Sequence, residues 1–265
     1  MSSKTSKILI VDDEQVIIDS LKKICSLEGY ETNSALDAET GLKLLDHEKF
    51  DLIISDIMLP EMDGFQFLEE LHNKKIDTPV IMTTGYSTVE NAVKSLHDGA
   101  IDYIPKPFSV DEILAAIHRG LKLISIKEKI KITDDSSIVY VECPSKYYRL
   151  GFSSWALLED KGSALVGVTD LFLNMIEDFE TIEIKESGDG IFQGTSCIRF
   201  NSENNLSHDL LSPVSGKIIE VNEQVKENKN IIQKDPYFEG WLYRVIPSDI
   251  EYEIKNLTSC SSNEL

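Results

Sequence analysis

The sequence predicts an α/β domain followed by a mainly β domain, and three observations support this prediction. Over roughly the first 130 residues, short apolar runs alternate with amphipathic helical segments, which is typical of an open, doubly wound parallel sheet. From Ile138 onward, alternating or β-branched runs are separated by glycine-containing turns, a pattern that indicates β-strands. The length of 265 residues allows two domains of ordinary size.

The first domain is predicted to contain five parallel strands with helices between them. KILIV (7–11) is continuously apolar, which suits a strand that is buried on both faces. A segment with helical spacing follows it, and Gly29 suits the end of that helix. Further strands are predicted at DLIIS (51–55), PVIMTT (79–84) and DYI (102–104). Capping boxes are predicted at STVE (87–90) and SVDE (109–112).

Polar residues follow the predicted strands at one edge of this sheet. The carboxyl ends of the strands are where an open α/β sheet carries its site. Carboxylate oxygens suit Mg²⁺, and a carboxylate beside this ion can attack phosphorus and form an aspartyl phosphate. A lysine and a hydroxyl group can then neutralise the phosphoryl oxygens and hydrogen-bond to them. The candidate residues are Asp12, Asp13, Asp56, Thr83, Thr84 and Lys106.

The first domain resembles a response regulator receiver domain over residues 6 to about 124. The resemblance rests on ILIVDDE, DLIISDIMLPEMDGFQFLEEL, PVIMTTGY and GAIDYIPKPF, in this order and spacing. It implies that Asp56 is the phospho-acceptor and that Lys106 pairs with the phosphate. The Mg²⁺ ligands that it implies are Asp12, Asp13, Asp56 and the backbone carbonyl of Met58.

The same resemblance implies a conformational switch. Thr84, and not Thr83, is the hydroxyl that senses the phosphate, and the amide of Gly85 faces the phosphate. Tyr103 changes rotamer together with Thr84, and the peptide bond before Pro107 is cis. Pro60 and Gly64 shape the loop after the phospho-acceptor. We expect a working receiver, because no residue of this set is missing.

The lifetime of the phosphoryl group is a separate expectation. Met58 and Tyr86 flank the expected path of the attacking water, and both side chains are bulky. We therefore hypothesise a long-lived phosphoryl state.

The domain boundaries follow from these patterns. The receiver is predicted at residues 1–126, and a helix extension and linker at 127–137, with too few heptads for a coiled coil. The second domain is predicted at 138–250, and a C-terminal tail at 251–265.

The second domain is predicted to be mainly β with one short helix. Its strands are predicted at SIVYVE, ALVGVT, TIEIKE and GKIIEV, and DLFLNMIED (170–178) is predicted to be a helix with Asp170 as N-cap. His208 beside Asp209 is interpreted as a solvated loop histidine, because no nucleophile accompanies it. Cys197 is interpreted as a buried, small apolar residue.

Residues from about 145 to 249 resemble the H-protein of the glycine cleavage system. The resemblance rests on VGVTDLFLNMIEDFETIEI, GDGIFQG, LLSPVSGKIIEVNE and KDPYFEGWLYRVIPSD. It implies a barrel-sandwich hybrid, the fold shared with lipoyl and biotinyl domains. Trp155 and Trp241 fall where family aromatics lie, and we expect both to be core residues.

An H-protein carries lipoate on a lysine at the tip of a hairpin, and this lysine is missing. Counting back from Pro213 places it at Asn205, and counting forward from Gly188 and Asp189 places it at Asn204. A carboxamide nitrogen is not a nucleophile, so we expect no lipoate. Modification of Lys217 or Lys185 is an open alternative, although both lie within predicted strand segments.

Composition restricts the partners. The net charge is −20, and both halves of the chain are acidic, which argues against nucleic-acid binding. The four cysteines are far apart and form no CxxC pair, so we expect reduced thiols and no cysteine metal site. No apolar run approaches the length of a membrane span, and no signal core is present, so we expect a cytoplasmic protein.

Together these features predict a two-component response regulator. A histidine kinase is its expected partner, and the H-protein-like domain is expected to dock a protein, lipoate-related enzymes being candidates. We expect no enzyme activity beyond the receiver's own phosphorylation and dephosphorylation; a homodimer through the receiver is a further option. Two alternatives stay open: a regulated lipoyl carrier with an unusual lysine, and a phosphate sink with an inert second domain. A transcription factor is the weakest alternative.

Overall fold

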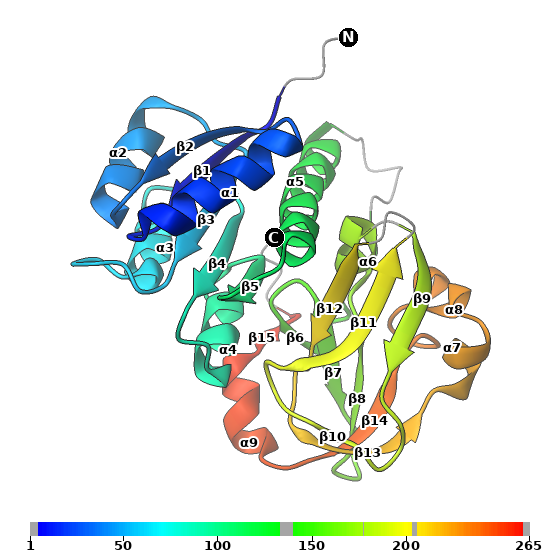
Figure 1. The fold of residues 1–265 in the computed structure, drawn as a ribbon. Helices are drawn as coiled ribbons and strands as arrows, with labels where there is room; N and C mark the ends of the chain where they lie inside the picture. The colour runs from blue at the N-terminus through cyan, green and yellow to red at the C-terminus, as the bar shows by residue number, and fades with distance from the viewer. Residues whose placement is uncertain (1–4, 133–139, 177, 203–205, 262–265) are drawn as a thin grey trace. The chain divides into compact units, whose positions relative to one another are not determined.

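The computed structural model describes residues 5–132, 140–176, 178–202 and 206–261 (Figure 1). Contacts among these residues divide the chain into two compact units. One lies within Met1–Ser87 and Asp98–Lys131, and the other within Thr88–His97 and Ile132–Leu265. Each unit has its own sheets and its own apolar core.

A five-stranded parallel sheet forms the first unit, with the strand order β2-β1-β3-β4-β5. Its strands are β1 (Lys7–Val11), β2 (Glu31–Ala35), β3 (Leu52–Asp56), β4 (Val80–Thr84) and β5 (Asp102–Pro105). Along the chain they alternate with α1 (Gln15–Leu27), α2 (Ala38–His47), α3 (Gly64–Asn73), α4 (Val89–His97) and α5 (Val110–Ile132). The predicted α/β fold class of the first domain is confirmed.

Helices cover both faces of this sheet. On one face, Leu9 and Ile53 of the strands share an apolar cluster with Leu42 of α2 and Phe67 of α3. On the other face, α5 lies so close that a Cβ on Gly120 would come within 2.5 Å of a Leu52 methyl group. This burial on both faces is the reason why the central strands read as continuous apolar runs.

Strand β2 is the element of this sheet that the sequence pattern does not specify. Its residues, ETNSA, are mostly polar, and only Ala35 is fully buried. It lies at the edge of the sheet, next to β1. This edge strand can carry polar residues, because most of its side chains are partly exposed to solvent.

The helix starts agree in part with the expected caps. The capping box at Ser109 is present: Ser109 N donates to Glu112 Oε2 at 2.7 Å, and Glu112 N donates to Ser109 Oγ at 3.2 Å. The other cap lies one residue later than expected, because Thr88 Oγ1, and not Ser87, accepts from Asn91 N at 3.1 Å. Gly29 follows α1 with a φ of 79°, as its expected place at the helix end requires.

A seven-stranded antiparallel sheet and a three-stranded antiparallel sheet form the second unit, in the orders β10-β13-β14-β8-β7-β6-β15 and β12-β11-β9. The strands are β6 (Tyr148–Leu150), β7 (Ser154–Leu158), β8 (Ala164–Val168), β9 (Phe179–Ile184), β10 (Gly190–Ile191), β11 (Ser196–Ser202), β12 (Ser207–Leu211), β13 (Gly216–Val221), β14 (Tyr243–Pro247) and β15 (Thr258–Ser259). The predicted mainly β fold class of the second domain is confirmed. Its short helices are α6 (Asp170–Ile176), α7 (Glu223–Glu227), α8 (Asn230–Lys234), α9 (Ile250–Glu253) and the 3-10 turn η1 (Ile254–Asn256), so the expectation of a single helix was wrong.

Trp155 occupies the core of the second unit. It is fully buried, and its Nε1 donates to the carbonyl oxygen of Val168 at 2.9 Å. Tyr147 packs edge-on against it, with ring centroids 4.9 Å apart. Trp241 is half-buried beside the same cluster, so it borders the core instead of filling it.

Two local expectations for the second domain were wrong. Tyr140–Glu142 form no strand; instead, Val141 N donates to Asp170 Oδ2 at 2.6 Å. The preceding residues of that predicted strand lie outside the described residues. Thr169, and not Asp170, caps α6, because Thr169 Oγ1 accepts from Phe172 N at 3.1 Å.

The C-terminal segment is structured where it is described. Residues 251–261, expected to belong to a tail, include most of α9, the turn η1 and strand β15. Strand β15 pairs with β6 at the edge of the seven-stranded sheet. The expected tail was therefore wrong for these residues. Among the residues that the structure describes, no helix combines the length and the apolar character that a membrane span requires.

Candidate functional site

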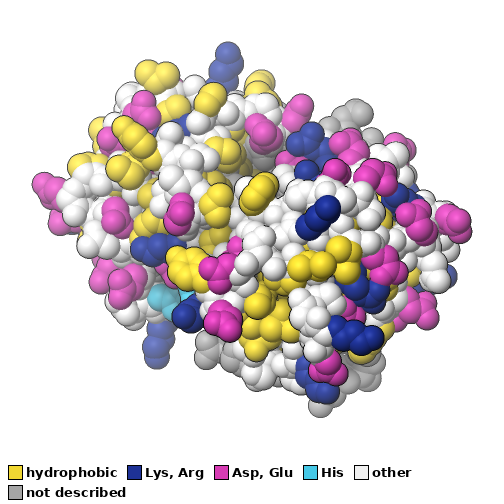
Figure 2. Space-filling model, turned by 90° about the horizontal axis from the view of Figure 1, so that it is seen from below, with side chains coloured by type: hydrophobic (Ala, Val, Ile, Leu, Met, Phe, Trp, Pro, Cys, Tyr) yellow, Lys and Arg dark blue, Asp and Glu magenta, His cyan; other side chains and the backbone are white. Residues whose placement is uncertain are grey.

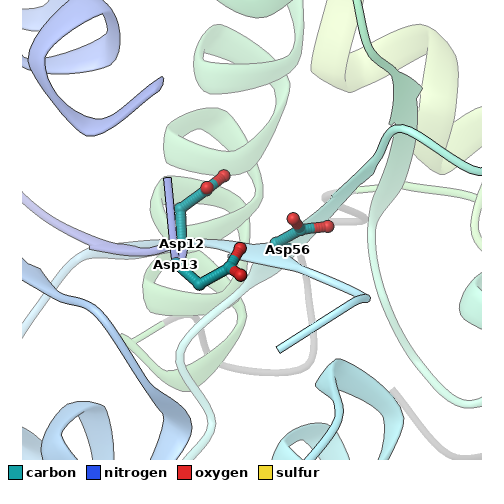
Figure 3. Close-up of side chains that lie close together, drawn as sticks. All are labelled: Asp12, Asp13 and Asp56. Carbon is teal, nitrogen blue, oxygen red and sulfur yellow. The ribbon is translucent and has the colours of Figure 1, made fainter. Parts of the chain in front are cut away.

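Three carboxylates meet at the carboxyl edge of the parallel sheet (Figure 3). Asp12 and Asp13 follow β1, and Asp56 is the last residue of β3. Each offers a carboxylate oxygen within 4.8 Å of the others. The two strands are neighbours in register, with Val11 beside Ser55, so the residues that end them come together.

The ammonium group of Lys106 lies among these carboxylates. Its Nζ is 2.8 Å from Asp56 Oδ2 and 2.7 Å from Asp12 Oδ2. Glu14, which the sequence reasoning missed, is a third acidic neighbour, with its Oε1 3.5 Å from Nζ. Lys106 follows β5, and the peptide bond from it to Pro107 is cis. Helix α1 begins directly after Glu14, which holds this residue near the site.

Backbone amides complete the surroundings of the two buried carboxylates. Glu14 N donates to Asp12 Oδ1 at 3.0 Å, and Met58 N donates to Asp56 Oδ1 at 3.2 Å. Asp12 and Asp56 are almost fully buried, whereas Asp13 is exposed. In each buried carboxylate, one oxygen therefore contacts the Lys106 ammonium group and the other accepts a hydrogen bond from a backbone amide.

Burial and ion pairing act in opposite directions on the pKa values of Asp12 and Lys106. Burial raises the pKa of Asp12, although its contacts with Lys106 and with the amide of Glu14 act in the opposite direction. Burial alone would lower the pKa of Lys106, but its contacts with Asp12 and Asp56 raise it above the ordinary value. Lys106 is therefore charged at neutral pH. One ammonium group among several carboxylates leaves an excess of negative charge, and hard oxygen ligands in this arrangement fit Mg²⁺.

Thr83 and Thr84, two neighbouring threonines at the end of β4, have side-chain hydroxyl groups with different hydrogen-bond partners. Thr84 Oγ1 accepts from Tyr86 N at 3.1 Å, and the Thr84 carbonyl oxygen accepts from Lys106 N at 2.7 Å. Thr83 Oγ1 instead donates to the carbonyl oxygen of Ser55 on β3, at 3.4 Å. The hydroxyl of Thr84 therefore contacts the loop after β4, while the hydroxyl of Thr83 contacts the neighbouring strand β3.

The loops around the site leave room above it. A Cβ added to Gly85 would meet no atom within 4 Å. Met58 is 51% exposed and Tyr86 is 71% exposed, so both side chains extend into solvent. The ring of Tyr103, on β5, is half-buried and packs against the apolar core.

Gly64 supports the loop that follows Asp56, beyond the turn role expected from the sequence. A Cβ at this position would lie 2.3 Å from the Asp56 carbonyl oxygen and 2.8 Å from Ile57 Cα. Gly64 N also donates to the Ile57 carbonyl oxygen at 2.8 Å. The start of α3 therefore packs directly on the backbone that carries Asp56, which only glycine allows.

The hairpin of the second domain joins β11 to β12. Asn204 and Asn205, the two possible positions of the missing lysine, lie outside the described residues. Lys217 is exposed on β13, opposite Gly190. Lys185 follows the end of β9, so it lies just outside the strand in which it was expected.

The other candidates of the second domain are structural. His208 is buried on β12 with 2% of its surface exposed, so the interpretation as a solvated loop histidine was wrong. Asp209 does not orient it, since both its carboxylate oxygens accept from Arg199, at 2.8 and 3.0 Å. Cys197 is buried, and burial raises the pKa of its thiol to about 12, which agrees with an unreactive side chain.

Two family models match the chain. The response regulator receiver domain matches residues 8–118, and the glycine cleavage H-protein matches residues 146–264. Among curated proteins, the chain is 41% identical over 126 residues to the regulatory protein AtoC of Escherichia coli (strain K12), and 34% identical over 122 residues to the response regulator MprA of Mycobacterium sp. (strain KMS). These alignments cover 48% and 46% of this chain, but only 27% and 53% of the relatives.

Solved structures resemble the two parts separately. A CheY-like receiver domain protein from Methanospirillum hungatei JF-1 is 40% identical and covers 49% of this chain and 100% of its own, with a TM-score of 0.44. A glycine cleavage system H protein from Mycobacterium marinum is 29% identical and covers 40% of this chain and 87% of its own, with a TM-score of 0.37.

Proposed function

We propose that this chain, which joins a response regulator receiver domain to a glycine cleavage H-protein domain, is a two-component response regulator that accepts a phosphoryl group on Asp56. One observation carries the proposal. A lysine ammonium lies 2.8 Å from the Asp56 carboxylate, at the point where Asp12 and Asp13 bring two further carboxylates. This arrangement provides a nucleophile, a cation-binding set and a positive charge for the phosphoryl oxygens.

Each residue of the site would have a separate role in the transfer of the phosphoryl group to Asp56. A carboxylate oxygen of Asp56 attacks the phosphorus of a phosphohistidine on the kinase, and the P–N bond breaks as the imidazole leaves. Asp12, Asp13, Asp56 and the carbonyl of Met58 would hold Mg²⁺, which neutralises charge on the carboxylates and on the phosphoryl group. Lys106 would exchange its contact with Asp56 for one with a phosphoryl oxygen, and the Gly85 amide would hydrogen-bond to another.

Thr84 and Tyr103 would pass this change to the surface. The Thr84 hydroxyl is engaged with Tyr86 N at 3.1 Å, so turning it toward a phosphoryl oxygen would release the loop after β4. The half-buried ring of Tyr103 would then change rotamer. A phosphoryl group can shift this equilibrium only by its different contacts in the two states.

We propose that the H-protein domain carries no lipoate and acts by docking a protein. No lysine occurs between Asn201 and Gly216, so the hairpin lacks an amine that could form the lipoyl amide. An H-protein surface is suited to the enzymes that handle lipoate, which makes such enzymes candidate partners. Phosphorylation would control this docking.

The surface charge supports a protein partner over a nucleic acid. On the face shown in Figure 2, acidic side chains are spread among the basic ones, and the described residues form no continuous basic surface there. The chain carries 46 acidic and 26 basic residues. A polyanion would be repelled by this balance.

The test is affinity capture with the full chain and its Asp56→Ala variant, each with and without acetyl phosphate and Mg²⁺, read by mass spectrometry. We expect acetyl phosphate to add one phosphoryl group to the wild-type chain only and to change the proteins it captures. Asp19→Ala is the matched control, because Asp19 is exposed on α1 and lies outside the acidic cluster. Phosphorylation of Asp56→Ala, or identical captures in both states, would contradict the proposal.

The same measurement separates two other functions. A lipoyl adduct on Lys217 or Lys185 in the intact mass would establish a carrier. Normal phosphorylation with no change in captured proteins would favour a phosphate sink, in which the receiver only drains a kinase.

A further inference from the structure

Cys143 and Cys260 hold a sulfur–sulfur contact within the second domain. Their Sγ atoms are 2.7 Å apart, although 117 positions separate them in the chain, and both are free thiols. Cys143 precedes β6 and Cys260 follows β15, and these two strands are paired. Cys260 N also donates to the Tyr147 carbonyl oxygen at 2.9 Å. The backbone on both sides therefore holds the two sulfurs together.

The surroundings of this pair favour a thiolate. The contact between the sulfurs lowers the pKa of Cys260 and raises the pKa of Cys143. The positive charge of Arg149, on β6, favours the thiolate form at both sulfurs, while burial opposes it. A thiolate beside a positive charge is the environment of a reactive cysteine.

The other two cysteines have the opposite environment. Burial raises the pKa of Cys25 to about 11 and that of Cys197 to about 12. Both are almost fully buried, as is Cys260, but Cys143 in contact with Cys260 is half-buried and gives small molecules access to the pair. The difference makes Cys25 and Cys197 internal controls for the pair.

We propose that Cys143 and Cys260 form a reversible redox site, in which a peroxide converts the two thiols to a disulfide. A thiolate of the pair attacks one oxygen of hydrogen peroxide, the O–O bond breaks, and hydroxide leaves and takes up a proton as water. The neighbouring thiol then attacks the sulfenic sulfur, the S–S bond forms, and a second water leaves. The two sulfurs lose two electrons, which the peroxide gains. An excess of a small thiol reverses the step by thiol–disulfide exchange.

Oxidation would cross-link the residue after β15, at the edge of the seven-stranded sheet, to the segment before β6. The bridge would close a loop that contains all of the sheet strands from β6 to β15. A cross-link over a loop of this length restricts the unfolded chain strongly, so the oxidised domain should unfold at a higher temperature.

Differential alkylation of the full chain tests the site. The reduced protein is treated with hydrogen peroxide, and it is then denatured and alkylated with a light reagent, so that every free thiol is blocked. It is next reduced and alkylated with an isotopically heavy reagent, and its peptides are mapped. We expect the heavy label on Cys143 and Cys260, an intact mass lower by two hydrogens before reduction, and full reversal by glutathione. Cys25 and Cys197 should carry no oxidation. A disulfide between other cysteines, or an intact mass without the loss of two hydrogens, would overturn the proposal.

Thermal unfolding supplies a second readout. Trp155 and Trp241 belong to the same packed cluster as the two cysteines, so tryptophan fluorescence reports the unfolding of this domain. We expect peroxide to raise its midpoint by roughly 5–10 °C in the wild type. Cys143→Ser keeps a hydrogen-bonding group and should show no such shift. An equal shift in Cys143→Ser would show that the bridge is not its cause.

Discussion

Lys106 Nζ lies 2.8 Å from Asp56 Oδ2, in a site where the lysine side chain is 8% exposed and the aspartate side chain 5% exposed. Asp56 ends β3 and Lys106 follows β5, and these strands are not neighbours, because they lie on either side of β4. Their contact links three strands at the carboxyl edge of the sheet. It also means that removing the lysine charge leaves the buried carboxylates of Asp12 and Asp56 without compensation.

Replacement of Lys106 by Met should destabilise the receiver. We expect a loss of about 3 kcal/mol in the free energy of unfolding, because Asp12 and Asp56 then lose their buried counter-charge. The loss should be smaller with Mg²⁺, which can replace the missing charge. Hydrogen exchange of the β1 and β3 amides in the full chain measures both effects.

The control for Lys106→Met is Lys74→Met. Lys74 Nζ contacts Asp46 Oδ1 at 2.9 Å, but both side chains are more than one third exposed. An exposed pair of this kind contributes less than about 1 kcal/mol. Equal losses in the two variants would show that burial does not set the importance of the Lys106 contacts.

Replacement of Thr84 by Ala should separate phosphorylation from signalling. The nucleophile and the lysine are intact in this variant, so acetyl phosphate should still phosphorylate Asp56, at a rate within about tenfold of wild type. The hydroxyl that would bind the phosphoryl group is gone, so the change in captured partners should be lost. Mass spectrometry of the intact chain and of the captured proteins gives both readouts.

Thr83→Ala is the matched control for this variant. The Thr83 hydroxyl donates to Ser55 on the neighbouring strand, away from the loop after β4. We expect it to keep both phosphorylation and partner exchange. If Thr83→Ala lost partner exchange while Thr84→Ala kept it, the two residues would have been assigned in the wrong order.

Replacement of Asp13 by Asn should weaken Mg²⁺ binding. Asp13 is exposed and contributes a carboxylate to the acidic cluster, so its loss should remove a ligand charge without disturbing the core. We expect an affinity lower by about tenfold or more in a calorimetric titration with MgCl₂. Asp19→Asn, on an exposed position of α1, should titrate like the wild type. Unchanged binding in Asp13→Asn would remove this residue from the ligand set.

The stability of the second domain should depend on Asp170 and on pH. Burial raises the pKa of this carboxyl group above 3.8, although Val141 N and Asn174 Nδ2 donate to it. The folded state therefore binds the proton more tightly than the unfolded state, and the ionised form costs stability above the raised pKa. This cost should disappear as the pH falls through the raised pKa toward 3.8.

Asp170→Asn tests the sign of this effect. An amide can keep an acceptor for Val141 N without a buried charge, so the variant should be more stable than wild type at neutral pH. The difference should shrink in acid, as measured by urea unfolding followed through tryptophan fluorescence. Asp160→Asn, at an exposed turn, is the control and should match the wild type at each pH. A gain for Asp170→Asn that grew in acid would contradict the assigned direction.

Much of the fold could be predicted because local pattern and burial agree. The central strands of the parallel sheet are apolar throughout, and each prediction for them falls within one residue of the structure at either end. Strand β2 could not be found in this way, since its position at the sheet edge allows a polar sequence. His208 likewise looks polar in the sequence, but the alternation of β12 turns it inward.

The sequence by itself determined the order of the two domains, the carboxylates at the strand ends, and the absence of a lysine between Asn201 and Gly216. These features depend on residue type and short spacing, which the chain displays directly. Only the tertiary structure decided which distant residues meet. It placed Glu14 beside Lys106, and it paired β15 with β6, so that Cys260 reached Cys143. Contacts between residues so far apart in the sequence arise from strand pairing and core packing, and no local pattern specifies them.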